Sequence, residues 1–68
     1  MADDFNMSLR KFLKRVGVTS QQEIEAAVRR AREAGTLPGG PLSAKVTLSM
    51  AGVGLVHEIS GEIETDEA

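Results

Sequence analysis

The sequence contains no cysteine, no tryptophan and no tyrosine, and its single histidine is His57. Without cysteine the chain forms neither disulfides nor thiolate metal sites, and it has no cysteine nucleophile. One histidine cannot by itself supply a zinc site with the usual four ligands. The sequence therefore predicts no metal site, no bound cofactor and no catalytic residue.

Aromatic side chains are equally scarce, since Phe5 and Phe12 are the only two. A chain of 68 residues is expected to form one small domain, and such a domain buries only about 60% of the surface of its unfolded chain. Small folds are usually stabilised by disulfides, by a metal or by association of subunits. With the first two excluded, we expect a homodimer.

Long apolar runs are also missing. No segment approaches the ~20 consecutive apolar residues that span a bilayer. Residues 1–4 are acidic, whereas the start of a secretory signal is basic. The sequence predicts a cytoplasmic protein that does not engage a membrane.

Charge is divided unevenly along the chain. Residues 1–35 carry seven lysines and arginines against five acidic residues, whereas residues 36–68 carry one lysine against five acidic residues. The two parts have net charges of +2 and −4, which give −2 overall. This asymmetry, with a pI of about 5.2, argues against a dedicated nucleic-acid-binding protein.

The first half of the sequence predicts two helices, at about residues 4–16 and 20–34. Apolar residues recur at spacings of three and four along the first segment, which places them on one face of a helix. Two acidic residues at its start and four basic residues at its end suit the helix dipole. Its apolar face consists of Phe5, Leu9, Phe12, Leu13 and Val16.

Residues 17–19 predict a break between these helices. Gly17 is suited to the left-handed position that ends a helix. Two overlapping capping-box patterns then begin at Thr19 and Ser20. The second helix is expected to end at Gly35, so that the two helices form an αα-hairpin.

Residues 35–41 are expected to form a loop or hinge, because residues 38–41 are Pro-Gly-Gly-Pro. Two strands are predicted beyond it, at about residues 43–51 and 54–63. Apolar residues are even-numbered in the first strand and odd-numbered in the second, so paired residue numbers must have an odd sum. Either a two-residue Gly-Val turn at 52–53 or a four-residue loop at 51–54 produces this register.

This register places Val46 opposite Ile59 and Leu48 opposite His57. His57 therefore falls on the apolar face, where we expect a buried or interfacial neutral side chain in place of a catalytic base. Two strands alone are marginal in water, so the hairpin needs further partners. Residues 64–68 lack anything to bury and are expected to fray.

Three strings of the sequence, FNMSLRKFLK, VGVTSQQEIE and LVHEISGEI, lie in the two predicted helices and in the second strand. On these strings the chain resembles a family of short bacterial proteins that is classed as a domain of unknown function. The resemblance covers nearly the whole sequence. It implies that the chain is a complete protein, and it supplies no activity, cofactor or catalytic residue.

The basic residues of the helices form the one candidate patch for an anion or a partner, although a solvated helix face is the favoured interpretation of their charge. A helix-turn-helix unit over residues 13–30 is a further alternative. It is disfavoured because Glu23 stands where that motif needs an apolar residue, and no third helix follows. The patch consists of Arg10, Lys11, Lys14, Arg15, Arg29 and Arg30.

Together these features predict an α+β protein of order ααββ, in which a helical hairpin packs on an antiparallel β-hairpin. Two copies are expected to complete a four-stranded sheet, either by pairing of strand edges or by exchange of hairpins about the 38–41 hinge. We expect a small non-catalytic interaction or accessory protein, whose partner beyond its own copy the sequence does not identify. The alternative is a weak nucleic-acid-binding module that uses the basic helical faces.

Overall fold

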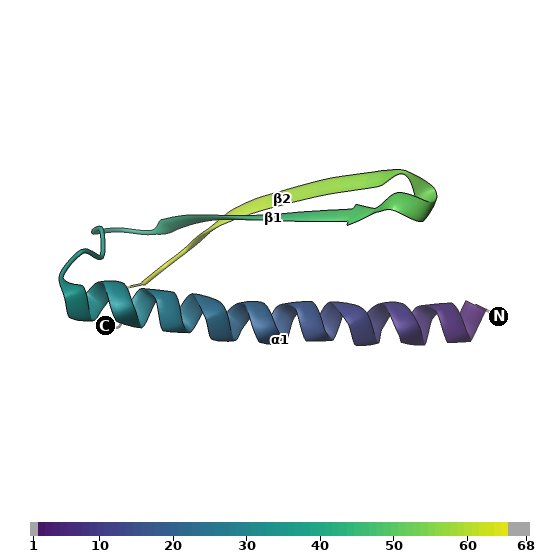
Figure 1. The fold of residues 1–68 in the computed structure, drawn as a ribbon, viewed down its shortest axis with the longest axis horizontal. Coiled ribbons are helices and arrows are strands. Elements are labelled where there is room, and N and C mark those ends of the chain that lie inside the picture. The colour runs from purple at the N-terminus through teal and green to yellow at the C-terminus, as the bar shows by residue number, and fades with distance from the viewer. Residues whose placement is uncertain (1, 66–68) are drawn as a thin grey trace. The chain divides into compact units, whose positions relative to one another are not determined.

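The computed structural model describes residues 2–65, and in that range it contains one long helix followed by a β-hairpin (Figure 1). The elements are α1 (Ala2–Ala34), β1 (Leu42–Met50), the 3-10 turn η1 (Ala51–Val53) and β2 (Leu55–Ile63). The chain divides into two compact units, Met1–Leu37 and Pro38–Ala68. The predicted α+β class, with helical structure first and an antiparallel hairpin second, is confirmed.

The helical unit differs from the prediction in one respect, because α1 runs without interruption for 33 residues. The helices predicted at about 4–16 and 20–34 are one helix, and the break predicted at 17–19 is absent. Gly17 does not have a positive φ, and the Thr19 hydroxyl donates to the carbonyl of Arg15 at 2.8 Å in place of capping a new helix. The same continuity excludes a helix-turn-helix unit over residues 13–30.

The helix continues through Gly17 because its apolar residues stay in phase on both sides of the glycine. The apolar residues Val16 and Ile24 are eight positions apart, with the small Ser20 midway between them, which keeps one face in line across the glycine. A glycine inside a helix costs about 1 kcal/mol relative to alanine. The Thr19 hydroxyl, satisfied by a carbonyl one turn earlier, does not require the helix to restart.

The C-terminal end of α1 is formed by Gly35, as predicted. The amide of Gly35 donates to the carbonyl of Arg32 at 3.2 Å, and the amide of Thr36 donates to the carbonyl of Ala31 at 2.9 Å. Gly35 has a φ of 73°, which costs glycine little and other residues more. This bonding pattern is a Schellman motif, and it directs the chain out of the helix into residues 36–41.

The hairpin has the predicted register in full. Met50 pairs with Leu55, Leu48 with His57, and Val46 with Ile59, and pairing continues to Leu42 and Ile63. The strand bounds lie within one residue of those predicted. Beyond β2, Glu64 and Thr65 have no regular structure, and Thr65 is nevertheless buried; residues 66–68 of the predicted frayed tail lie outside the described range.

The structure also decides between the two predicted turns. Residues 51–54 form the loop, with η1 over its first three positions and Gly54 in the left-handed conformation at a φ of 63°. The amide of Gly54 donates to the carbonyl of Ala51 at 3.2 Å. Gly52 does not have a positive φ, so the two-residue turn with a left-handed first glycine does not form.

We predict that Gly54→Ala destabilises the protein by about 1 kcal/mol, because alanine resists a positive φ. Gly52→Ala is the matched control, since a side chain there meets nothing within 4 Å and the backbone is not left-handed. Urea unfolding of the two variants measures the difference. An equal loss of stability in both variants, or a larger loss in Gly52→Ala, contradicts the four-residue loop.

No hydrophobic side chain in residues 3–65 is fully buried. Phe5 is 65% exposed and Phe12 is 50% exposed, so neither aromatic residue is enclosed. The described chain thus has amphipathic elements without an enclosed core of its own. As a result, the apolar residues of α1 and of the hairpin lie at the surface of these elements.

Candidate interaction surfaces

The first candidate surface is the apolar stripe of α1, which we call the helix stripe. Most of its residues recur at spacings of three and four, and Val16 and Ile24 are eight apart with Ser20 midway between them, so they share one side of the helix from near its start to near its end. Because the helix is continuous, the stripe extends over about 39 Å at 1.5 Å per residue. It consists of Phe5, Leu9, Phe12, Leu13, Val16, Ile24, Ala27 and Ala31.

The second candidate surface is the apolar face of the hairpin, which we call the hairpin face. Side chains alternate between the two sides of a strand, and the observed register brings the apolar side chains of both strands to one side. Val46 and Ile59, which pair at the middle of the face, are 45% and 59% exposed. The face consists of Leu42, Ala44, Val46, Leu48, Met50, Leu55, Ile59 and Ile63, with His57 and Gly61 among them.

His57 lies on the hairpin face, opposite Leu48 as predicted. Its neighbours on the same side of β2 are Leu55 and Ile59, whereas Glu58 projects from the other side. The side chain is exposed in the single chain, so the expected burial does not occur within one copy. Whether an interface covers it is a separate prediction that depends on association.

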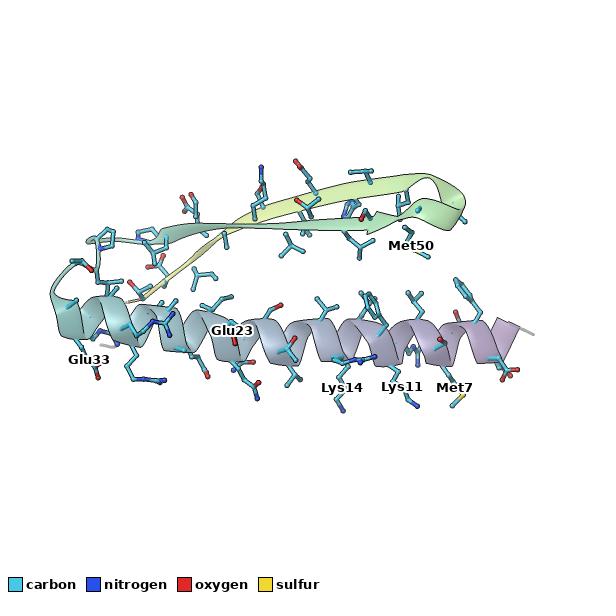
Figure 2. All side chains as sticks on the ribbon, viewed as in Figure 1. Met7, Lys11, Lys14, Glu23, Glu33 and Met50 are labelled. Carbon is cyan, nitrogen blue, oxygen red and sulfur yellow. The ribbon has the colours of Figure 1, made fainter. Side chains whose placement is uncertain are left out.

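The candidate basic patch is divided by the continuous helix into two groups. Lys11 and Arg29 are 18 residues apart, which is five turns of α1, or about 27 Å along its axis. Lys11 and Lys14 project from the same side of α1 as Met7 (Figure 2). The helix therefore sets Arg10, Lys11, Lys14 and Arg15 well apart from Arg29 and Arg30.

The other side of the hairpin is polar and bears a shallow, open hollow. It is lined by the main chain and side chains of residues 43–45 and 60–62, with Lys45 and Glu62 as its charged members. Within residues 2–65 no group of three or more potential metal ligands comes together. The hollow has neither the depth nor the converging polar groups of a binding site.

Sequence reasoning missed some exposed apolar residues that belong to neither surface. Val56 projects among the polar side chains of the hairpin and is 72% exposed. Met7 and Val18 lie on α1 away from the helix stripe and are also exposed. Met7 and Val18 are 11 residues apart, close to three whole turns, and this spacing could have indicated that they share one side of the helix.

A model of a family of unknown function (DUF6494) matches residues 1–66 of the chain. No curated protein and no solved structure matches it. Among the described residues, α1 included, no helix combines the length and the hydrophobicity needed to cross a membrane.

Proposed function

The chain belongs to this family of unknown function, and from its geometry we propose that it is a small non-catalytic interaction protein that acts as a homodimer. The observation that carries the proposal is the exposure of its hydrophobic residues. No hydrophobic residue in the range 3–65 is buried, although both α1 and the hairpin have an apolar face. A second copy is the partner that every chain has available.

The lengths of the two surfaces also support a second copy. The hairpin face is nine residues long on each strand, or about 27 Å between its end residues at 3.4 Å per residue. The helix stripe is longer, at about 39 Å. One hairpin is therefore too short to cover the stripe from end to end.

The proposal assigns no catalytic activity to the chain and places it in the cytoplasm. Its one histidine stands among apolar neighbours on β2, and its carboxylates on the hairpin are Glu58 and Glu62 on the opposite side. A cysteine-free, acidic sequence is compatible with the reducing cytoplasm.

Sedimentation equilibrium of the unmodified chain tests this proposal. We predict a mass twice the 7.2 kDa of one chain, and a midpoint of urea unfolding that rises with protein concentration because association stabilises the folded state. A mass of one chain, together with a cooperative unfolding midpoint that is independent of concentration, contradicts it.

A further inference from the structure

Within residues 2–65 the sheet consists of β1 and β2 alone, so both edges of the hairpin are unpaired in that range. Such edges present free backbone donors and acceptors that pair with another strand unless the edge is protected. A two-stranded hairpin is itself marginal in water, and three or more strands give independent stability. Which edge accepts a partner can be argued from the charges that each strand carries.

We propose that two copies pair antiparallel through β1, forming a four-stranded sheet of order β2-β1-β1-β2. This deepens the proposed function, on which it rests, by naming the strand, the register and the symmetry of the contact. The proposed twofold axis passes beside Val46, the middle residue of β1. The occupant of the β1 edge is therefore the same strand of a second copy.

Charge favours the β1 edge over the β2 edge. On the polar side of the hairpin β1 carries one charged residue, Lys45, whereas β2 carries Glu58 and Glu62. Pairing through β2 sets four carboxylates on the two central strands, where like charges destabilise a sheet. Pairing through β1 instead sets two lysines at the centre, each beside the two glutamates of its own β2.

The register follows from the alternation and from Lys45. Apolar residues of β1 are even-numbered, so a twofold axis at Val46 keeps both apolar faces on one side and overlaps all nine residues. Lys45 then faces Thr47 of the second copy, and Ala44 faces Leu48. An axis moved to Lys45 would set the two lysines directly opposite one another, which is unfavourable.

The outer strands of this assembly explain why it stops at two copies. A β1-to-β2 contact between copies leaves an open edge at each end and propagates into a fibre. A β1-to-β1 contact closes, and it turns both β2 strands outward. Charged side chains such as Glu58 and Glu62 on an outer strand oppose further strand addition.

Single cysteine substitutions test the proposed β1–β1 contact without background from native thiols, because the chain has no cysteine of its own. At the proposed axis the Cα atoms of Val46 in the two copies are about 5 Å apart, which lies within the range of a disulfide. Ile59, the cross-strand partner of Val46, is then separated from its own copy by three strand spacings, or about 14 Å. That distance is far beyond disulfide reach.

We predict that Val46→Cys forms a disulfide-linked dimer at least about tenfold faster than Ile59→Cys in a glutathione buffer. Val56→Cys, on the polar side of β2, is the control for random collision and is expected to react as slowly as Ile59→Cys. Faster crosslinking at Ile59 assigns the seam to β2 and overturns the proposal. Equal rates at Val46 and Val56 overturn it as well.

A nitroxide label at the exposed turn residue Val53 gives an independent readout. The antiparallel β1–β1 pairing places the two turns at opposite ends of the sheet, about 35–40 Å apart, and pulsed electron resonance measures that distance. Turns that lie close together overturn the proposed arrangement. If the unmodified chain sediments as a monomer, the proposed function fails; if it is a dimer with a different seam, only this inference fails.

Discussion

Ile59→Asp is expected to abolish the dimer, whereas Val56→Asp is expected to leave it intact. Both residues lie on β2, but Ile59 belongs to the hairpin face and Val56 to the polar side. Both are largely exposed in the single chain, at 59% and 72%. Exposure in one copy therefore does not distinguish them, whereas covering of the hairpin face in the proposed dimer does.

The size of the effect follows from the cost of burying a charge. A carboxylate in an apolar interface without a partner costs about 3 kcal/mol or more, which raises the dissociation constant by about 100-fold or more. Aspartate at a solvent-exposed position changes stability by about 0.5 kcal/mol at most. Strand propensity affects both variants alike, so it cancels in the comparison.

Sedimentation equilibrium and far-ultraviolet circular dichroism measure the outcome together. Ile59→Asp is expected either to sediment as one folded chain or to lose helical signal because the free chain has no buried core. Retention of both the dimer mass and the parent unfolding midpoint by Ile59→Asp contradicts an interface on the hairpin face. The same loss in Val56→Asp contradicts the assignment of faces.

At Gly17 we expect alanine to stabilise the protein by about 1 kcal/mol and proline to destabilise it by about 3 kcal/mol or more. The helix is continuous there, and a side chain at Gly17 meets nothing within 4 Å. Alanine gains helix propensity without a steric cost. Proline removes an amide hydrogen bond and collides with the preceding turn.

Thermal unfolding followed by circular dichroism measures both changes, which amount to roughly 4–8 °C per kcal/mol for a domain of this size. Gly35→Ala is the matched control, because the same substitution at a φ of 73° is expected to cost about 1 kcal/mol. If Gly17→Ala destabilises the chain as Gly35→Ala does, the helix breaks at Gly17 after all.

The hairpin was predictable in detail because strand alternation has a period of two. A shift of one residue moves Val46 or Ile59 to the polar side, so paired residue numbers have an odd sum, and the glycine-bearing turn near residues 51–54 then selects one register. Parity did not determine the turn, because the two-residue turn and the four-residue loop give the same strand pairing. The left-handed residue proved to be Gly54, which the parity of the strands does not determine.

The helix was mispredicted because its local signals are ambiguous. Glycine followed by threonine and serine is typical of a helix end and a new cap, but threonine is also satisfied inside a helix by the carbonyl one turn earlier, as Thr19 is. The decisive information is the phase of apolar residues across Gly17, which local motifs do not contain. That error also made the two basic groups seem closer than α1 allows.

The positions of the apolar faces were predictable from the sequence, whereas their burial was not. The register places His57 on the apolar side, but its burial depends on what covers that side. Burial of an element is determined by its neighbours, and the described part of one chain does not supply enough of them. The sequence pattern therefore specifies which faces are apolar and does not specify what covers them.

The helix and the hairpin are both held by hydrogen bonds between residues close in sequence, and this affects how fast the chain folds. Helical bonds join neighbouring turns, and the most widely separated pair of the sheet joins Leu42 to Ile63 across a single hairpin. Helices form in about 0.1–1 μs and hairpins in about 1–10 μs. In the proposed dimer the encounter of two copies is then the slow step, so the time a newly made chain needs to complete its structure depends on the concentration of that chain.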